Sequence, residues 1–506
     1  MLNDIFKPLK SGTDIRGTAV EIPGGEPVQL TDEIVGAIGY GFAAWLYENV
    51  TPSSGVFTVA VGHDSRISAD RIKAAFISGL LACGINVKDC GLSSTPAMFM
   101  TTVDFECDAA VEITASHHPF HKNGLKFFTK KGGLEATDIE QILTNAQYEV
   151  KPENISEVVP GKVEKAAYMN IYAAMLREKI CKEVNADDYS RPLRDFKIIV
   201  DAGNGAGGFY ATKVLEPLGA DVSGSQFLEP DGMFPNHVPN PESSVAMSYV
   251  STAVKKQNAD LGIIFDTDVD RAACVTESGK EINRNALIAL AAAIALEGNE
   301  GGTIVTDSVT SSGLKDFIEK ELGGKHHRFK RGYKNIINEC KRLNLEECVN
   351  SPLAIETSGH AAMRENYFLD DGAYLITKII IKAAQLDKEG KTLESLIQNL
   401  VEPAESEEYR IKILDSDFKT YGSTVISQLE KHIRNDSAYT VANDSFEGIR
   451  ASKTSADGWF LLRLSVHDPI LVLNIESNSL NGTKSIQDDL RDFFSKYDSL
   501  DVTALL

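Results

Sequence analysis

Three runs of apolar, mostly β-branched residues recur along the chain, and each leads into a turn rich in Gly, Asp and Ser. The runs are "FTVAVGHDSR" at residues 57–66, "FKIIVDAGNGAGG" at 196–208 and "GTIVTDSVTSSG" at 302–313. The segments that follow them, "ADRIKAAFISGLLACG", "GFYATKVLEPLG" and "LKDFIEKELGG", read as helices. This strand, turn and helix rhythm predicts three related α/β units with mixed, mostly parallel sheets.

A second strand in each unit ends in a polar loop. The strands with their loops are "AAVEITASHH", "ADLGIIFDTDVDR" and "SPLAIETSGH". The polar residues in these loops are Ser116, Asp266, Asp268, Asp270, Glu356, Ser358 and His360. Because open α/β sheets bind ligands at the carboxyl ends of their strands, we expect the three loops to carry the function.

The last hundred residues have a different pattern. The short apolar runs "YTVAN", "WFLLRLS" and "PILVLNIES" predict a smaller α+β domain. We therefore expect four domains, at residues 1–165, 166–282, 283–402 and 403–506.

Composition narrows the class of protein. Hydrophobic residues make up 43% of the 506 residues and charged residues 24%, so sizeable cores can form. The net charge of -21 argues against nucleic acid as the main partner. The seven cysteines include no CxxC pair, which favours reduced thiols over a disulfide framework or a zinc site. Apolar runs such as "ALIALAAAIALEG" are too short to span a bilayer and no signal peptide is evident, so we expect a cytoplasmic protein without a membrane partner.

The acidic loop "DTDVDR" places three carboxylates at alternate positions after the strand-like run "LGIIF". Oxygen ligands of this kind select Mg²⁺, Ca²⁺ or Mn²⁺ over zinc. An EF-hand is excluded because Arg271 takes the position that needs Gly and because a strand, not a helix, precedes the loop. A solvated acidic turn is the alternative, but it leaves three aspartates repelling one another.

The turn "GNGAGG" matches the GxGxxG pattern through Gly203, Gly205 and Gly208. The acidic residue expected further on is not convincingly placed at Asp221 or Glu229. A tight turn with close helix packing therefore explains these glycines at least as well as a dinucleotide site.

The loop "TASHHPFHKNGLKFF" contains Ser116 and, after it, Lys126. Its histidines are His117, His118 and His121. Pro119 prevents a regular helix through the histidines and no acidic ligand is near, which argues against zinc. A hydrolase triad is not favoured, because the loop lacks GxSxG and because we expect adjacent Ser116 and His117 side chains to point apart in an extended chain. A serine that carries phosphate fits better, its charge being met by Lys126, imidazole donors and the metal of the acidic loop.

The segments "GTDIRG", "TASHHPFHKNGLKFF", "DTDVDR" and "ETSGH" occur in the order found in the α-D-phosphohexomutase family, and the chain resembles its phosphoglucomutase/phosphomannomutase type. "VGHDSRIS", "VDAGNGAGG" and "FPNHVPNPE" also resemble family segments. The resemblance implies four domains around a central cleft, a phosphoserine at Ser116, and Mg²⁺ held by Asp266, Asp268 and Asp270 with the serine's phosphate. It also implies that "GNGAGG" is scaffold and not an NAD site.

The resemblance carries further roles onto this sequence. The residues implied to surround the transferring phosphoryl group are Arg16, His117, Lys126 and Arg271. Those implied to bind the sugar are Glu356 and Ser358, with His360 beside them, and Arg331, Gly332 and Tyr333 of "KRGYKN". For the base that takes the hydroxyl proton we expect Lys126, if neighbouring cations and burial depress its pKa, and His360 as the second candidate.

The implied reaction converts glucose or mannose 1-phosphate to the 6-phosphate through a hexose 1,6-bisphosphate, which would also act as activator. Its partners would be small sugar phosphates, and the protein a monomer or dimer. A bisphosphate synthase on the same scaffold and a phosphoglucosamine mutase are the alternatives. A silent sugar-phosphate sensor and an NAD-dependent dehydrogenase are less favoured.

The fourth domain departs from the family pattern of a distal phosphate loop. "RLSVHDP" keeps Arg463 and Ser465 but has Val466 and His467 where a small residue and Thr are usual. "RASKT" at residues 450–454 is a second candidate that lacks the proline, and its Lys453 is a possible compensating cation. Thr267 likewise replaces a common Gly in the metal loop.

Overall fold

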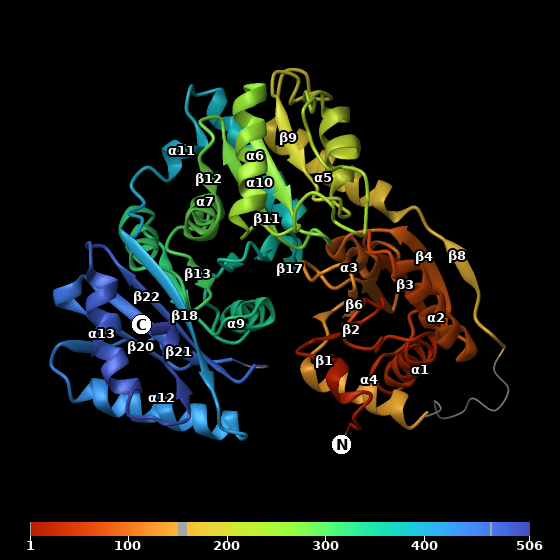
Figure 1. Cartoon of the computed structure of the whole chain (residues 1–506). Helices are drawn as coiled ribbons and strands as arrows, with labels where there is room; N and C mark the ends of the chain where they lie inside the picture. The colour runs from red at the N-terminus through yellow and green to blue at the C-terminus, as the bar shows by residue number, and fades with distance from the viewer. Residues whose placement is uncertain (1, 150–158, 466–467, 506) are drawn as a thin grey trace. The chain divides into compact units, whose positions relative to one another are not determined.

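The computed structural model describes residues 2–149, 159–465 and 468–505 (Figure 1). The chain divides into two compact units, here named unit 1 (Met1–Leu287 with Ser358–Ser395) and unit 2 (Ile288–Thr357 with Leu396–Leu506). Unit 1 therefore takes in the end of the third predicted domain. The four domain boundaries expected from the sequence stay a prediction.

The first α/β domain is built on an eight-stranded sheet with the order β1-β2-β6-β5-β3-β4-β8, and β7 pairs with β6. Strands β3, β4, β5 and β8 are parallel, whereas β6 runs antiparallel to both β5 and β2, so the sheet is mixed. The strands are β1 (Lys10–Ser11), β2 (Asp14–Thr18), β3 (Thr58–His63), β4 (Asn86–Leu92), β5 (Ala109–Ile113), β6 (Lys122–Thr129), β7 (Gly132–Gly133) and β8 (Val163–Lys165). The helices are α1 (Asp32–Asn49), α2 (Ala69–Ala82), α3 (Thr95–Asp104) and α4 (Ala136–Gln147).

Helices α1, α2 and α4 bury their apolar sides in one core with the strands of this sheet, among them Phe42, Phe76 and Phe127. Trp45 stacks on Phe42 in the same core, with ring centroids 6.0 Å apart. The helix α2 confirms the first predicted strand, turn and helix.

The second α/β domain has a four-stranded sheet with the order β12-β11-β10-β9, in which only β9 and β10 are parallel. Its elements are α5 (Tyr168–Val184), β9 (Ile198–Asp201), α6 (Ser244–Gln257), β10 (Leu261–Phe265), β11 (Ala272–Thr276) and β12 (Glu281–Ile282). After "GNGAGG" the expected α-helix is instead a π-helical turn, Tyr210–Leu215, followed by a 3₁₀ turn, Glu216–Leu218. Pro217 lacks the N–H that an α-helix needs, which explains the break.

The third set of elements is shared between the two units. Unit 2 holds α7 from Ile288 onward and three parallel strands in the order β14-β13-β15. These elements are α7 (Arg284–Leu296), β13 (Thr303–Thr306), α8 (Ser312–Asp316), β14 (Lys325–Arg328), α9 (Tyr333–Leu345) and β15 (Leu353–Ile355). Unit 1 holds the antiparallel pair β16 (Ala361–Met363) and β17 (Leu369–Asp370), with α10 (Gly372–Asp387) and α11 (Leu393–Leu396).

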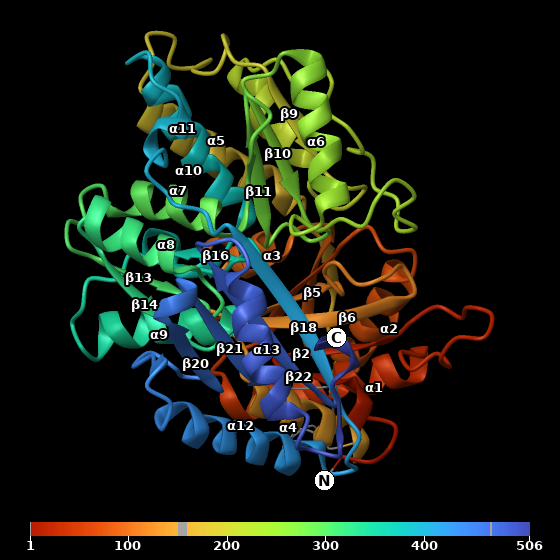
Figure 2. The ribbon, with the colours of Figure 1, turned by 60° about the vertical axis from the view of Figure 1, so that its left-hand side comes forward.

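The C-terminal domain is an antiparallel six-stranded sheet, β19-β20-β21-β22-β18-β23, against which α12 and α13 pack (Figure 2). Its elements are β18 (Glu405–Ile413), α12 (Phe418–Arg434), β19 (Tyr439–Val441), β20 (Ile449–Lys453), β21 (Gly458–Leu464), β22 (Ile470–Ser477), α13 (Gly482–Phe494) and β23 (Leu500–Asp501). The predicted fold class, three α/β units with mixed sheets and a smaller α+β domain, is confirmed in its elements. No helix of the described residues is long and apolar enough to cross a bilayer.

Candidate functional site

Ser116 lies in the loop that follows the buried strand β5, where its backbone adopts the left-handed conformation with φ of 50°. Its hydroxyl donates to Asp266 Oδ2 at 2.9 Å and accepts from Arg271 Nη2 at 2.9 Å. The expectation that Ser116 and His117 point apart is wrong, because Ser116 Oγ lies 3.4 Å from His117 Nδ1. The left-handed backbone at Ser116 replaces the extended chain on which that expectation depended.

The acidic loop follows β10, as the sequence predicts, and its three carboxylates converge. Ligand oxygens of Asp266, Asp268 and Asp270 all lie within 4.8 Å of one another, and all three residues are buried. Oδ1 of Asp268 and Oδ1 of Asp270 make no hydrogen bond to a described residue. These oxygen donors fit a hard divalent cation, and their burial disfavours the solvated acidic turn.

The charge balance in this cluster is unequal. Burial and the neighbouring carboxylates of Asp270 and Asp268 raise the pKa of Asp266 well above its usual value. Burial also opposes ionisation of Asp270, but Lys126, His360 and Arg271 together lower its pKa. Three buried carboxylates therefore share two cationic side chains, Lys126 and Arg271.

Lys126 lies in β6 and is only 3% exposed. Its amine donates to Asp268 Oδ2 at 2.8 Å and also pairs closely with the carboxylate of Asp270. Carboxylates hold this amine, and its role as a general base stays a prediction.

The two histidines next to Ser116 are not cations near neutral pH. Burial and then Arg271 lower the pKa of His117 to about 2. Burial and then Arg16 lower the pKa of His118 to about 4. Arg271 Nη2 approaches His117 Nδ1 closely, and a neutral imidazole can accept that hydrogen bond.

Arg16 comes from β2, whose register places it opposite Gly124 of β6. Its guanidinium donates to Asp14 Oδ2 at 2.8 Å. The charge of Arg16 contributes to the lowered pKa of both His117 and His118, which follow Ser116.

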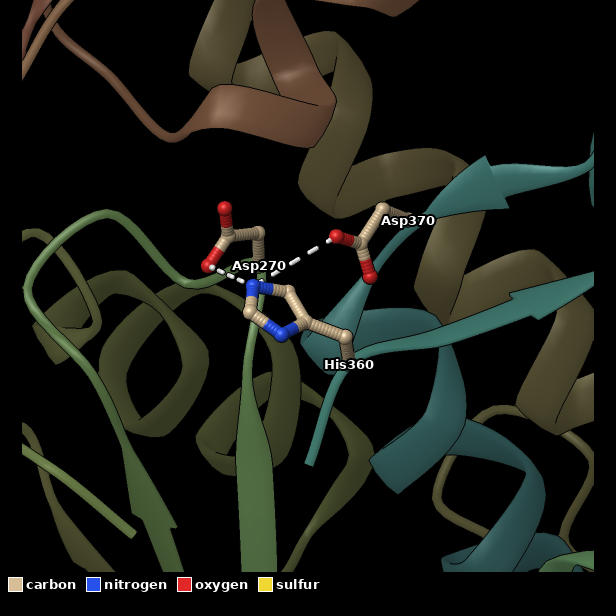
Figure 3. A group of neighbouring side chains, drawn as sticks. All are labelled: Asp270, His360 and Asp370. Atoms are coloured by element: carbon tan, nitrogen blue, oxygen red, sulfur yellow. Dashed lines mark ion pairs between the residues drawn. The ribbon is translucent and has the colours of Figure 1, made fainter. Parts of the chain in front are cut away.

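His360 joins this cluster from the start of β16 (Figure 3). Its Nε2 lies 3.6 Å from Asp270 Oδ1 and 3.7 Å from Asp370 Oδ2. Its Nδ1 lies 2.9 Å from Ser358 Oγ, and a β-bridge joins its backbone to that of Arg271. Asp370 was missed from the sequence because nothing local distinguishes it from a strand-end aspartate.

The glycine-rich turn supports the acidic loop. Ala206 N donates to Thr267 O at 2.8 Å, and a Cβ on Gly205 would lie 2.6 Å from the same carbonyl oxygen. Gly203 and Asn204 have positive φ values of 52° and 60°. Close packing thus accounts for these glycines without a nucleotide.

The other residues expected to bind the sugar belong to unit 2. Glu356 Oε1 accepts from Gly332 N at 2.6 Å, and Arg331 N donates to Glu447 Oε1 at 3.0 Å. Tyr333 begins α9 directly after Gly332, whose φ of 113° only glycine adopts readily. The structure therefore brings "KRGYKN" and Glu356 together within this unit.

The fourth domain has two candidates for a distal phosphate loop, and their arginines differ in the contacts that they make. Arg450 of "RASKT" is buried, donates to the carbonyls of Ser308 and Thr310 at 2.8 and 3.0 Å, and lies 3.4 Å over the ring of Trp459. The Lys453 amine donates to Asp489 Oδ2 at 2.6 Å. This ion pair would have to break before Lys453 could bind a phosphate.

Arg463 of "RLSVHDP" has more freedom to bind a ligand. Its Nε makes no hydrogen bond within the part of the chain that the structure describes, and burial followed by Arg331 lowers its pKa. Ser465 N donates to Ile470 O at 3.0 Å, and Ser465 Oγ accepts from Asp468 N at 3.2 Å. His467 and Val466 lie outside the described residues.

Two supporting residues were not singled out from the sequence. Thr95 begins α3 and donates through Oγ1 to Asp268 Oδ2 at 2.5 Å. Arg66 of "HDSR" donates to four carbonyls of the Ser116 loop, among them His118 O at 2.6 Å. The signal that could have found Arg66 is the charged Asp64–Arg66 turn at the end of an apolar strand.

Family models match most of the chain. They describe phosphoglucomutase/phosphomannomutase α/β/α domains I, II and III and match residues 9–151, 171–279 and 283–404. A phosphomannomutase/phosphoglucomutase of Pseudomonas putida is 30% identical over 435 residues, which cover 86% of each chain. A phosphoglucomutase/phosphomannomutase of Thermococcus kodakarensis is 31% identical over 473 residues, 92% of this chain and 93% of that one.

Among solved structures, a phosphoglucomutase/phosphomannomutase family protein of Burkholderia thailandensis has the same fold. The TM-score is 0.79 at 24% identity, and the match covers 99% of each chain.

Proposed function

The chain belongs to the phosphoglucomutase/phosphomannomutase family, and on that premise we propose that it moves a phosphoryl group between the 1- and 6-oxygens of a hexose. The observation that carries the proposal is Ser116 Oγ held 2.9 Å from both Asp266 Oδ2 and Arg271 Nη2, beside three converging carboxylates. A hydroxyl in such a setting suits the exchange of a phosphoryl group.

The reaction would have two matched steps. In the first, a free hydroxyl of the hexose monophosphate attacks the phosphorus on Ser116, the phosphorus–Oγ bond breaks, and a hexose 1,6-bisphosphate forms. In the second, Ser116 Oγ attacks the other phosphate of that bisphosphate and releases the isomeric monophosphate. The hydroxyl proton leaves in the first step and is returned in the second, so the enzyme ends phosphorylated as it began.

We propose Mg²⁺ as the cation of the acidic loop, held by Asp266, Asp268, Asp270 and the phosphate on Ser116. When bound, the ion would neutralise negative charge on the transferring phosphoryl group. The chain's own cations would add to that charge neutralisation: Arg271 through its contact with Ser116, and Arg16 and Lys126 from neighbouring strands. Neutral His117 would donate a hydrogen bond from Nε2 to the transferring phosphoryl group.

For the proton of the attacking hydroxyl, the proposal keeps two bases. Lys126 is the first, but it must release its contacts with Asp268 and Asp270 to act. His360 is the second, and its Nε2 lies beyond hydrogen-bond distance from both Asp270 and Asp370. Activity measured after Lys126→Gln and after His360→Gln separates them, because loss of the base lowers kcat more than KM.

For the sugar we propose Glu356, Ser358, Arg331, Gly332 and Tyr333. For the phosphate that stays on the sugar we propose Arg463, Ser465 and His467. Glu356 and Ser358 suit hydroxyl recognition in two orientations, because one accepts hydrogen bonds and the other can donate or accept.

The test begins with the intact mass of the protein. Wild type treated with glucose 1,6-bisphosphate and Mg²⁺ should gain one phosphate, and Ser116→Ala should gain none. Glucose 1-phosphate should then be converted to glucose 6-phosphate with catalytic bisphosphate, and chelation with EDTA should stop the conversion. A serine that never accepts phosphate would refute the proposed function.

Product profiling over glucose, mannose and glucosamine phosphates identifies the sugar. Stoichiometric accumulation of bisphosphate would favour the synthase alternative, and preference for glucosamine phosphate would favour the phosphoglucosamine mutase. Activation by hexose 1,6-bisphosphate, the cytoplasmic location and a monomer or dimer stay predictions.

A further inference from the structure

A single buried guanidinium gathers the main chain around Ser116. Arg66 lies just after β3 and is only 2% exposed, so it cannot reach a bound sugar phosphate. Its five N–H donors are all used. Nη1 donates to Pro119 O and Lys122 O at 2.8 Å each, Nη2 to His118 O at 2.6 Å and to Ser116 O, and Nε to Asp64 Oδ2 at 3.2 Å.

Asp64 is also linked to the main-chain N–H of Ser116, through the side chain of Thr114. Asp64 Oδ2 accepts from Thr114 Oγ1 at 2.7 Å, and Thr114 Oγ1 accepts from Ser116 N at 2.9 Å. Asp64 Oδ1 accepts from the Arg66 main-chain N at 2.9 Å. Both the N–H and the C=O of Ser116 are therefore tied to Asp64, one through Thr114 and the other through Arg66.

This arrangement explains the unusual backbone of Ser116. A serine with φ of 50° is disfavoured in isolation, and four carbonyl groups turned toward one point would repel one another without a donor. A planar guanidinium with five fixed donors satisfies them together, whereas a lysine ammonium offers three donors from one point. The ring of Phe234, from the second domain, lies 5.3 Å from the Arg66 guanidinium carbon and covers it.

We propose that Arg66 is a positioning residue for phosphoryl transfer, which clamps the Ser116 loop (residues 114–122) so that Ser116 Oγ stays between Asp266 and Arg271. The kinetic part of this inference rests on the proposed function. The clamp acts through the main chain, because the guanidinium donors of Arg66 are taken up by Asp64 and by four carbonyls of the loop.

The first experiment measures the loop without relying on activity. In Arg66→Lys, hydrogen exchange of the Ser116, His118 and Lys122 amides should speed up by at least about tenfold. Arg71→Lys is the matched control, since Arg71 also donates to two main-chain carbonyls of the same domain, Ala19 O and Leu30 O at 2.8 and 2.9 Å. Unchanged exchange in Arg66→Lys, or equal acceleration in Arg71→Lys, would overturn the clamp.

The second experiment measures the consequence for phosphoryl transfer. In Arg66→Lys, kcat should fall about 10- to 100-fold, because a misplacement of about 1 Å has an effect of that size. KM for the sugar phosphate should stay within about twofold, because the lost contacts are not made to substrate. A raised KM with unchanged kcat would contradict a positioning role.

Thr114 provides a second route if Arg66→Lys does not fold. Thr114→Val should reproduce both the faster exchange and the lower kcat, and Thr114→Ser, which keeps the hydroxyl, should restore both. Equal behaviour of the two Thr114 variants would overturn the proposal. If wild type accepts no phosphate while the exchange results hold, the proposed function fails and the clamp stands.

Discussion

Asp64 and Asp307 occupy equivalent places in the first and third α/β units, yet their carboxylates make different contacts. Each follows a parallel strand, β3 or β13, and each accepts through Oδ2 a 2.7 Å hydrogen bond from a threonine in the loop of the neighbouring strand. The threonines are Thr114, two residues before Ser116, and Thr357, next to Glu356. The repeat of α/β units thus extends to the hydrogen bond that anchors each functional loop.

The difference lies in the second carboxylate oxygen. In Asp64 it accepts from the main chain of Arg66, whose guanidinium also neutralises the charge. In Asp307 the corresponding Oδ1 makes no hydrogen bond with any residue that the structure describes. Burial, followed by the charge of Glu356, raises the pKa of Asp307 to about 7.

This comparison shows two ways of holding a loop. The Ser116 loop must keep one backbone conformation, and a charged clamp provides it. The loop around Glu356 presents a carboxylate that accepts from Gly332 N, and the neighbouring Arg331 N donates to Glu447, also in unit 2. Burial raises the pKa of both aspartates, but the charge of Arg66 opposes the rise at Asp64, whereas the charge of Glu356 adds to it at Asp307.

The largest difference is expected when each aspartate is replaced, in a separate variant, by its neutral amide. Asp64→Asn leaves Arg66 as a buried cation without its counter-charge and should lower the free energy of unfolding by about 3–5 kcal/mol. Asp307→Asn, the matched variant, should not destabilise at neutral pH, because it removes a charge that burial disfavours. Unfolding in guanidinium chloride, followed by circular dichroism, measures both, and equal losses would contradict the stated difference.

A second prediction asks whether the metal loop also depends on backbone fit. In Gly205→Ala the new Cβ would lie 2.6 Å from Thr267 O and push the acidic loop, so Mg²⁺ affinity should fall about tenfold, or about 1.4 kcal/mol. Gly313→Ala makes a similar main-chain clash, 2.1 Å from Val401 O, in unit 2 and should leave Mg²⁺ affinity unchanged. Titration calorimetry with Mg²⁺ distinguishes the two.

A third prediction concerns pH. The pKa of Asp307 is about 7 in the folded chain and near 3.8 when unfolded, so the folded state holds an extra proton between these values. Its contribution to stability is therefore full below about pH 4 and is lost as pH rises to about 7, by at least about 1 kcal/mol.

Asp307→Asn should remove this part of the pH dependence. The difference in unfolding temperature between wild type and variant isolates it, because other buried groups, such as Glu476 with its pKa raised by burial to about 7, titrate equally in both. A stabilising effect of the wild-type aspartate that grows with pH would have the wrong sign.

The smallest effect is expected at Glu447, which anchors Arg331 N and Ser308 Oγ. Glu447→Gln weakens these bonds by about 1 kcal/mol and should raise KM for the sugar phosphate severalfold. Phosphorylation of Ser116 at saturating bisphosphate should proceed at its normal rate, since Glu447 makes none of the contacts that hold Ser116. Glu339→Gln, which alters a buried carboxylate bound to His327 and Arg342, is the control and should leave KM unchanged.

Local sequence was enough to predict the strand-end loops. Apolar runs ending at Ile113, Phe265 and Ile355 are strands, and the residues after them are the candidate site residues. The convergence of the three aspartates also follows from their spacing, because alternate residues of a curled loop can face one point.

The supporting contacts could not be predicted in the same way. Asp64 and Thr114 are 50 residues apart, and their hydrogen bond exists only because β3 and β5 are neighbours in the sheet. The left-handed backbone at Ser116 depends on that contact and on Arg66, so a local interpretation of the loop as extended was wrong. Lys126 lies against the acidic loop, and its carboxylate partners, Asp268 and Asp270, are more than 140 residues away in the sequence.

The cation over Trp459 has a practical consequence. The chain contains two tryptophans, Trp45 stacked on Phe42 in unit 1 and Trp459 beneath Arg450 in unit 2. Each unit thus carries one tryptophan in a distinct environment, one among aromatic rings and one against a guanidinium. Emission from Trp45→Phe and Trp459→Phe proteins can therefore follow the melting of either unit by itself, without an added label.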